Sequence, residues 1–233
     1  MNNIVFDSAL NIRRRICARE ISVLEVIESH LAAIAVRNPE VNSVVTICAD
    51  QALDQAKKLD AKLNAGEKLG ALAGLPVGIK DTTDTKDIRT TYGSKLFEDN
   101  VPAADAAIVE RIKQADGIII GKTNTPEFAA GANTVNAVFG ATNNPWNKAL
   151  SAGGSTGGGA AGLASGFFAL AEGTDLGGSL RIPAAFCGVV GIRTTPGLIP
   201  YLPNGSPFDL FDVEGPMART VPDLALALSV YSG

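Results

Sequence analysis

The chain has 233 residues, of which 46% are hydrophobic and 19% charged, and this is enough apolar material for one sizeable core or two small ones. Because 24 acidic residues stand against 20 lysines and arginines, the net charge is −4, and nucleic acid is not expected as a partner. The richest apolar run, residues 160–171, contains glycine and serine and is too short to span a bilayer, so no membrane segment is expected.

The few metal-binding and redox-active side chains also limit the function. Cys17, Cys48 and Cys187 are odd in number and lack metal-type spacing, so they predict free thiols in a reducing cytoplasm. Cys187, within AAFCGVVG, is interpreted as a small core residue. The N-terminus lacks the pattern of a signal peptide, in agreement with a cytoplasmic protein. With one histidine and no paired thiolates, metal catalysis is not expected, although a site made of carboxylates alone stays open. No cofactor is expected.

The first part of the chain predicts helices. Ser22 and Glu25 have the spacing of a capping box, and the apolar face that follows them predicts a helix that ends near Asn38 and Pro39. A second helix is predicted over 52–63, with Gly66 as its C-terminal stop. Both helices are interpreted as structural.

Helices and strands alternate after this segment. A short apolar strand is predicted at 74–80, a helix at 105–115 and a buried strand at 117–121. This order predicts an α/β layered fold. We expect one domain, with a helical N-terminal segment over about 1–70 and an α/β core over about 71–233.

Two glycine-rich motifs are tested first as phosphate-binding loops. GIIIGKT, residues 117–123, has three residues between its glycines where a P-loop needs four, and all three are isoleucines. GGSTGGG, residues 153–159, does not follow an apolar strand and does not have the dinucleotide-binding spacing. Nucleotide binding is therefore not expected.

Glycines frame two serines, Ser155 in SAGGSTGGGAAG and Ser179 in TDLGGSLR, which suggests acyl transfer by an activated serine. A serine needs a base. His30 flanks the apolar face of the first helix and is interpreted as a partly buried packing or surface histidine. Lys80 ends the strand at 74–80 and could act as the base if burial lowered its pKa. On position alone, a surface lysine is the simpler interpretation.

Several long motifs occur in one order: GLPVGIKD, GKTNTPEFAAG, NPWN, AGGSTGGGAAGLASG, GTDLGGSLRIPAAFCGVVGIR and GPMARTVPDLA. With these motifs the chain resembles the amidase signature family of serine hydrolases, from about Gly74 to the last residue. The resemblance implies an α/β/α sandwich around a mixed β-sheet. It also implies an amidase that hydrolyses a carboxylic amide, or an ester, to an acid and an amine or ammonia through a seryl acyl-enzyme.

The resemblance also implies roles for individual residues. Ser179 would be the nucleophile, Ser155 the bridging serine, which follows a cis peptide bond in the family, and Lys80 the base of a Ser-Ser-Lys triad. The oxyanion hole would consist of the backbone N–H groups of Leu176, Gly177, Gly178 and Ser179.

Other motif residues are given weaker roles. Asp175 and Arg181 flank the nucleophile and are expected to pair and hold the loop, although each could be a solvated charge. Thr123, Asn124 and Phe128 lie in a motif that is near the site in the family, and Phe128 could equally be a core residue. Thr156 stands where the family commonly has a second serine, and GIRTTPG departs from the common form as well.

The family's chains are considerably longer, which predicts that the C-terminal part of the family fold is absent here. A cleaved product, one half of a split enzyme and a natural short form all remain open. A helix is predicted from Thr220 on, and the sheet edge beyond it would be unpaired. The expected partner is a complementary C-terminal polypeptide or second subunit, without which we expect little activity.

Two other functions stay open beside the amidase. One is the glutaminase subunit of a tRNA-dependent amidotransferase, which shares these motifs, although FDLFDVEGPM, residues 208–217, differs from that subunit's usual wording. The other is a non-catalytic half that binds a complementary chain.

Overall fold

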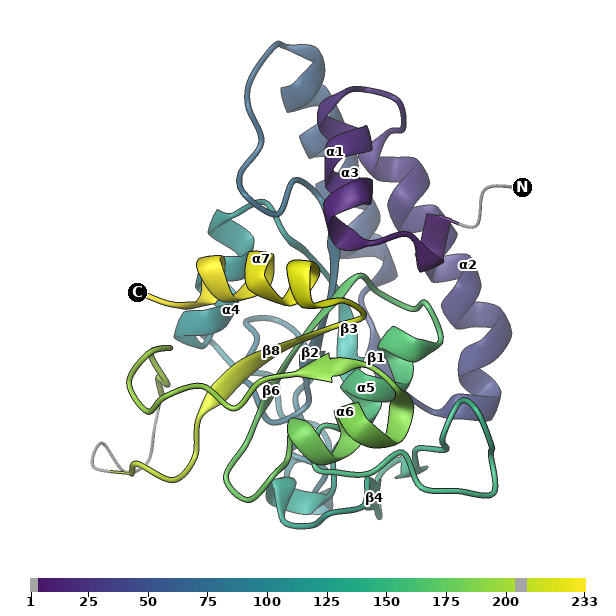
Figure 1. The fold of residues 1–233 in the computed structure, drawn as a ribbon, viewed down its shortest axis with the longest axis vertical. Helices are drawn as coiled ribbons and strands as arrows, with labels where there is room; N and C mark the ends of the chain where they lie inside the picture. Colours follow the sequence, from purple (N-terminus) through teal and green to yellow (C-terminus); the bar gives the residue numbers. More distant parts are fainter. Residues whose placement is uncertain (1–3, 204–208) are drawn as a thin grey trace.

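A computed structural model describes residues 4–203 and 209–233, and its central element is a six-stranded sheet in the order β1-β3-β2-β6-β8-β7 (Figure 1). The strands are β1 (Val44–Ile47), β2 (Pro76–Lys80), β3 (Ile118–Thr123), β6 (Leu170–Thr174), β7 (Val190–Gly191) and β8 (Glu214–Ala218). The neighbours β3, β2 and β6 are parallel, whereas β1, β8 and β7 are antiparallel to their neighbours. The predicted α/β fold with a mixed sheet is confirmed.

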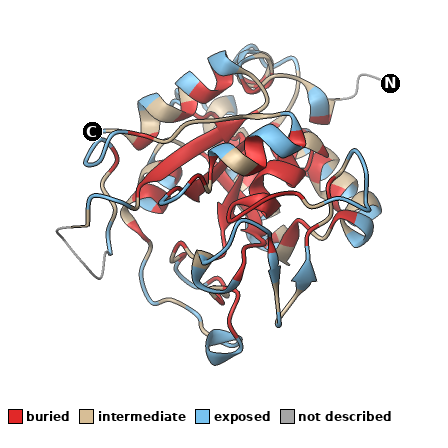
Figure 2. Cartoon of the chain, turned by 60° about the horizontal axis from the view of Figure 1, so that its bottom comes forward, coloured by how far each residue is buried: buried red, intermediate tan, exposed pale blue. Residues whose placement is uncertain are grey.

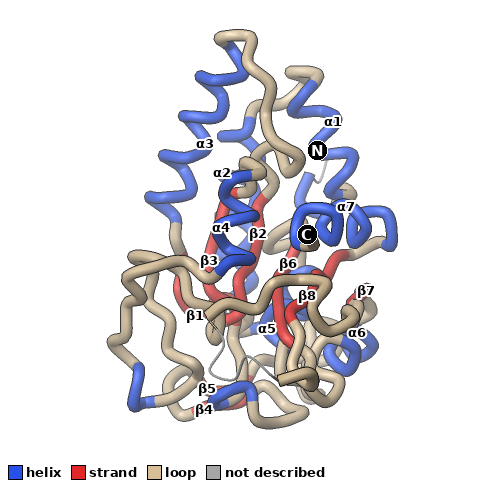
Figure 3. The backbone as a smooth tube through the Cα atoms, turned by 90° about the vertical axis from the view of Figure 1, so that its left-hand side faces the viewer, coloured by secondary structure: helices blue, strands red, loops and turns tan. Residues whose placement is uncertain are grey.

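Helices cover both faces of this sheet. They are α1 (Ala9–Cys17), α2 (Val23–Val41), α3 (Ala49–Asn64), α4 (Ala107–Gln114), α5 (Gly157–Ala164), α6 (Arg181–Cys187) and α7 (Val221–Tyr231). Figure 3 shows α1 and α3 together at one end of the molecule and the small hairpin of β4 (Val135–Asn136) and β5 (Gly140–Ala141) at the other. The described helices do not include one that is both long and apolar enough to cross a membrane.

Alternate residues of the central strands point to two separate apolar clusters. Leu170 and Ala218 belong to the cluster formed with α1, α3, α4 and α7, while Ala171 and Met217 belong to the cluster formed with α5 and α6. Because successive side chains of a strand face opposite sides, a strand covered on both faces reads as an unbroken apolar run. Figure 2 shows the central strands buried between these layers.

The N-terminal helices agree with the sequence apart from one boundary and one strand. The capping box of Ser22 and Glu25 is present, but α2 continues past Pro39 to Val41. Pro39 removes one N–H donor in the last turn, and the helix ends at Asn42, whose left-handed conformation suits a C-cap. The strand β1 follows α2 and pairs with β3 at the edge of the sheet. It lies in the N-terminal segment, for which only helices were predicted.

The later elements lie close to their predicted positions. β2 and α4 fall within 74–80 and 105–115, and β3 runs two residues past 117–121. Helix α7 begins at Val221, where the Thr220 hydroxyl accepts a hydrogen bond from the Asp223 N–H at 3.3 Å. This is the N-cap that the sequence predicts.

The cysteines and the histidine are located as follows. The three cysteines are free thiols, Cys17 exposed and the other two buried, which agrees with a core position for Cys187. His30 is completely buried on α2, so the partly buried or surface position predicted for it is wrong. Its Nδ1 lies 2.8 Å from the Val26 carbonyl oxygen, and burial lowers its pKa to about 4. These contacts give it a packing role.

Candidate active site

Lys80 ends β2, and its side chain is completely buried, so the interpretation as a surface lysine is wrong. Its Nζ donates hydrogen bonds to the Ser155 Oγ at 2.6 Å and to the Thr174 Oγ1 at 2.8 Å. Burial disfavours the ammonium and lowers the pKa of Lys80 to about 8, although nearby Glu172 opposes the shift. A substantial fraction of the amine is therefore neutral near pH 8.

Ser155 precedes α5, and the peptide bond between Gly154 and Ser155 is cis, as the resemblance implies. A Cβ at Gly154 would lie 2.8 Å from the backbone nitrogen of Asn133, so glycine is needed for this close approach. The next residue, Thr156, donates its N–H to the Ser179 carbonyl oxygen at 3.1 Å. This bond holds the two serine-bearing segments side by side.

Ser155 and Ser179 line one cavity of about 380 Å³ together with Leu176, Gly177 and Phe128. The hydrogen bonds found among the described residues do not include one between the Oγ atoms of the two serines. The hydrogen bond between Lys80 and Ser155 is thus the contact that the first link of the predicted relay would use. For the second link, the structure gives only that Ser155 and Ser179 line the same cavity.

The loop before Ser179 is organised by the buried carboxylate of Asp175. Arg181 donates to it from Nε at 3.0 Å and from Nη2 at 2.9 Å, so the predicted ion pair is confirmed. Burial alone would raise the pKa of Asp175, but the hydrogen bonds from Arg181 and from the Gly178 and Leu180 N–H groups outweigh it and lower this pKa to about 2. The carboxylate therefore stays ionised and fixes the turn.

The turn engages one of the four backbone N–H groups that were predicted to form the oxyanion hole. The Gly178 N–H donates to the Asp175 Oδ1 at 2.7 Å, whereas the bonds of the described residues include no acceptor for the N–H groups of Leu176, Gly177 and Ser179. Those three residues also line the cavity. Of the four predicted oxyanion donors, three are available and one is engaged elsewhere.

The sequence analysis missed several residues around Lys80. Glu172 is completely buried on β6 and accepts hydrogen bonds from the Lys80 N–H at 3.0 Å and from the Thr83 Oγ1 at 3.1 Å. Two residues further along the same strand, Thr174 contacts the Lys80 amine. A signal for both was present, because LAEGT places a carboxylate and a hydroxyl at alternate positions of an otherwise apolar buried strand.

A second buried lysine was missed as well. Lys122 on β3 is completely buried, and its Nζ donates to the Thr85 Oγ1 at 2.9 Å, to the Thr90 Oγ1 at 3.0 Å and to the Thr83 carbonyl oxygen. Burial lowers its pKa to about 8. Its signal was a lysine inside the buried strand IIIGKT.

The remaining predicted residues fall into two groups. Thr123 and Asn124 are buried and are not among the residues that line the cavity; the Asn124 side chain donates to the Thr142 Oγ1 at 3.0 Å and so anchors a neighbouring loop. Phe128 is 51% exposed and lines the cavity, so it is not a core residue.

Comparison with known proteins agrees with this geometry. The family model described as Amidase matches residues 25–233. The A subunit of the glutamyl-tRNA(Gln) amidotransferase from Alkaliphilus metalliredigens (strain QYMF) is 42% identical over 224 residues, which cover 96% of this chain and 46% of that protein. The corresponding protein of Carboxydothermus hydrogenoformans is 43% identical over 97% of this chain and 47% of its own length.

Solved structures that resemble this chain include amidase signature enzymes. A bacterial aryl acylamidase of the amidase signature enzymes superposes with a TM-score of 0.94 at 35% identity, covering 98% of this chain and 48% of that one. A 6-aminohexanoate cyclic dimer hydrolase in complex with its substrate superposes with a TM-score of 0.91 at 34% identity, covering 98% and 47%. The chain spans about half the length of the relatives it matches. On its motifs, its fold and these matches, the chain belongs to the amidase family, the amidase signature enzymes.

Proposed function

We propose that this protein is an amidase that hydrolyses a carboxylic amide through an acyl-enzyme on Ser179, with Ser155 and Lys80 completing a Ser-Ser-Lys triad. The observation that carries the proposal is the 2.6 Å contact between the buried Lys80 amine and the Ser155 hydroxyl, at the edge of the cavity that Ser179 also lines. The free thiols of the chain further support a role in the reducing cytoplasm.

Proton transfer begins from neutral Lys80. A neutral amine offers one lone pair, and it can donate an N–H to Thr174 while it accepts the proton of Ser155. Ser155 in turn takes the proton of Ser179 as the Ser179 oxygen attacks the amide carbonyl. The same path in reverse protonates the leaving amine, and a water molecule then hydrolyses the acyl-enzyme.

The tetrahedral intermediate carries a negative oxygen that needs hydrogen-bond donors. The N–H groups of Leu176, Gly177 and Ser179 fit this role, since the Gly178 N–H is held by Asp175. Asp175 and Arg181 act through the shape of this turn. We assign them as positioning residues.

The test uses the full-length product of the gene, purified and then treated with a fluorophosphonate, which labels activated serines covalently. We expect a single adduct on Ser179, and we expect that Ser179→Ala abolishes both labelling and the hydrolysis of simple alkyl and aryl amides. Ser165→Ala is the matched control, because Ser165 caps the far end of α5. An adduct on Ser155, or unchanged turnover in Ser179→Ala, would refute the assignment.

A second candidate function is the glutaminase subunit of a tRNA-dependent amidotransferase. It is supported by the 42–43% identity to the amidotransferase proteins, which exceeds the 30–35% identity to the solved amidases. The sequence of segment 208–217, which differs from the usual sequence of that subunit, was the argument against this function. The structure describes residues 209–217 of it, and residue 208 lies outside the described residues. The word "subunit" in the names of these relatives supports a second polypeptide as partner here too.

The two functions differ in substrate and in dependence on a partner. The glutaminase would release ammonia from glutamine, and the rate of this release would rise when glutamyl-tRNA and the other subunits are added. The amidase would hydrolyse simple amides in the absence of both. Sedimentation of the purified protein shows whether a second polypeptide is bound. Fast turnover of aryl amides by a monomer without ammonia release from glutamine would exclude the second candidate.

A further inference from the structure

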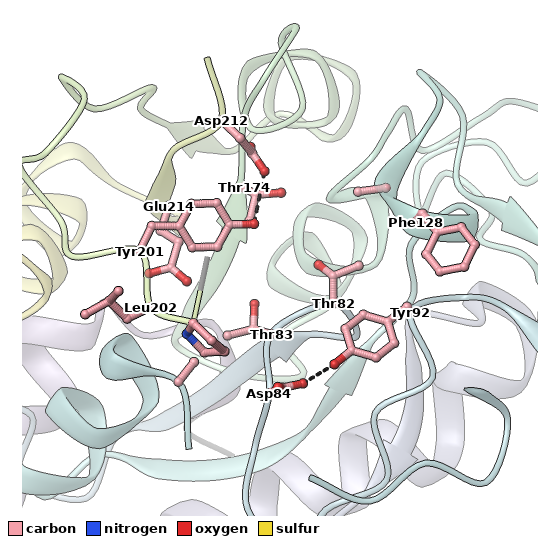
Figure 4. Close-up of a pocket in the computed structure, with 13 residues that line it drawn as sticks. Thr82, Thr83, Asp84, Tyr92, Phe128, Thr174, Tyr201, Leu202, Asp212 and Glu214 are labelled. Carbon is pink, nitrogen blue, oxygen red and sulfur yellow. Dashed lines mark hydrogen bonds between the residues drawn. The ribbon is translucent and has the colours of Figure 1, made fainter. Parts of the chain in front are cut away.

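Figure 4 shows a second cavity, of about 260 Å³. It adjoins the cavity that the two serines line. The two cavities share four lining residues, Phe128, Ala129, Thr174 and Asp212. Since Thr174 contacts the Lys80 amine, a group bound in the second cavity lies within a few atoms of the proposed catalytic lysine.

The charged lining of this second cavity is entirely acidic. Its ionisable side chains include the carboxyl groups of Asp84, Asp212 and Glu214, and its lining residues do not include a lysine or arginine. The Tyr92 hydroxyl donates to Asp84, and the Tyr201 hydroxyl donates to the Asp212 Oδ2 at 3.0 Å. Two of the three carboxyl groups are therefore held in place by tyrosines.

The third carboxyl group, Glu214, lacks such a tyrosine. It is 1% exposed, it begins β8 directly opposite Thr174 of β6, and within the described residues its Oε2 has no hydrogen-bond partner. Burying a polar atom without a partner is unfavourable, so a buried carboxyl group that lines a cavity is suited to a ligand that donates a hydrogen bond to it.

The charges around Glu214 favour a cation. Burial, Glu172 and Asp212 all raise the pKa of Glu214 well above its usual range. Burial also raises the pKa of Asp212. A raised pKa means that a carboxyl group tends to keep its proton, and a positive group in the cavity would favour the ionised form, because it attracts a carboxylate.

The cation that fits is an organic ammonium rather than a metal ion. Asp84, Asp212 and Glu214 line one cavity but do not form a group that could hold a metal ion together, and the described residues do not include another such group of carboxylate, thiolate or imidazole ligands. The cavity is instead lined by the aromatic rings of Tyr92, Phe128 and Tyr201. Aromatic faces attract ammonium groups, and carboxylates accept their hydrogen bonds.

We propose that this acidic cavity, formed by Asp84, Asp212 and Glu214, binds a protonated amino group of the substrate, so that the protein prefers amides that carry an ammonium close to the scissile bond. The proposal rests on the proposed amidase function and specifies its substrate class. Glu214 is the main specificity residue, since it is almost completely buried and has no tyrosine partner, whereas Asp212 has one free oxygen, Oδ1, beside the oxygen that Tyr201 holds.

The test compares matched amides in the complete purified protein. One series has the amino group on the acyl side: ω-amino primary amides of three to six carbons, each paired with the alkyl amide that has a methyl in place of the ammonium. The other has it on the leaving side: N-(aminoalkyl) acetamides paired with N-alkyl acetamides. We expect kcat/KM to favour the ammonium member at least tenfold in one series, which also identifies the side.

Glu214→Gln keeps the shape of the side chain and removes its charge. We expect it to bring the kcat/KM ratio of ammonium to neutral substrate to within about threefold of one, mainly by raising KM for the ammonium member. Glu110→Gln makes the same change at an exposed position of α4 and should leave the ratio as it was. If Glu214→Gln does not fold, Asp212→Asn is measured in its place and should lower the ratio in the same direction.

A binding measurement separates failure of this proposal from failure of the amidase function. Titration calorimetry with n-butylammonium and n-butanol should show binding of the ammonium at least tenfold tighter, and Glu214→Gln should remove the difference. Hydrolysis of neutral amides with ratios near one in both series would overturn the ammonium site and leave the amidase standing. If no amide is hydrolysed, the amidase proposal fails, and the calorimetry alone upholds or overturns the cation site.

Discussion

Lys80 and Lys122 lie at the ends of neighbouring parallel strands, where Lys80 pairs with Thr123 and Lys122 with Ile79. Both are completely buried, and burial lowers the pKa of each to about 8. They differ in what their amines contact. Lys80 contacts a serine that lines a cavity, whereas the hydrogen bonds of the Lys122 amine to the described residues all go to buried threonine oxygens.

This difference shows that a lowered pKa does not by itself identify a base. A base also needs a path along which a proton can arrive from a reacting group, and among the described contacts of the two lysines the one between Lys80 and Ser155 suits such a path. Lys122 instead ties the loop at 83–90 to β3 through its three hydrogen bonds. We infer that one lysine serves the chemistry and the other the fold, and the following predictions test that division.

The largest effect is expected from Lys80→Met. The loss of the base should lower kcat/KM by about 10²- to 10⁴-fold, measured with a neutral amide. Lys80→Arg should be similarly inactive, because a guanidinium cannot give up its proton at usable pH. Lys122→Met is the matched control, and in the fraction that stays folded its kcat/KM should remain within about tenfold of the parent. Equal losses in the two methionine variants would abolish the distinction.

The pH dependence of the parent enzyme should follow the neutral form of Lys80. Because burial lowers the pKa of this lysine to about 8, the neutral fraction increases as pH rises through that value. We expect log kcat/KM to rise with a slope near one below pH 8 and to level off above it, a gain of roughly a hundredfold between pH 6 and pH 9. A flat profile over this interval would argue against a titrating base. Circular dichroism at each pH controls for unfolding.

Stability should show the opposite ranking of the two lysines. Lys122→Met removes a hydrogen-bond donor from two threonine hydroxyls and from the Thr83 carbonyl, which keeps the Thr85 hydroxyl as its second donor, and this should lower the free energy of unfolding by about 1–3 kcal/mol. We expect a smaller loss for Lys80→Met, because the Ser155 and Thr174 hydroxyls that it frees have no donor bond among the described residues and can turn to donate, whereas the Thr85 and Thr90 hydroxyls already donate to carbonyl oxygens. Urea unfolding of both variants measures this. A more stable Lys122→Met would contradict the structural role.

The sequence predicted the elements around these lysines better than their contacts. Local patterns predicted β2, β3 and the pairing of Asp175 with Arg181, because periodicity and nearby charges act over a few residues. The contacts of Lys80 with Glu172 and Thr174 span 92 and 94 residues, so no local pattern contains them. The engagement of the Gly178 N–H by Asp175 likewise depends on the shape of the turn, which composition does not specify.

The smallest expected effect is a shift in the pH profile of kcat/KM when a threonine that contacts one of the two lysine amines is replaced. This shift distinguishes Lys80 from Lys122 most directly. Thr174 accepts a hydrogen bond from Lys80, and Thr90 accepts one from Lys122. An acceptor bonds more strongly to an ammonium than to a neutral amine, so its removal should lower the pKa of the lysine it contacts. Thr174→Val should therefore move the midpoint of the kcat/KM profile to lower pH by less than about one unit.

Thr90→Val makes the same substitution beside Lys122 and should leave that midpoint in place, because the profile reports only the base. A shift with Thr90→Val and none with Thr174→Val would reverse the assignment and make Lys122 the lysine that the reaction titrates.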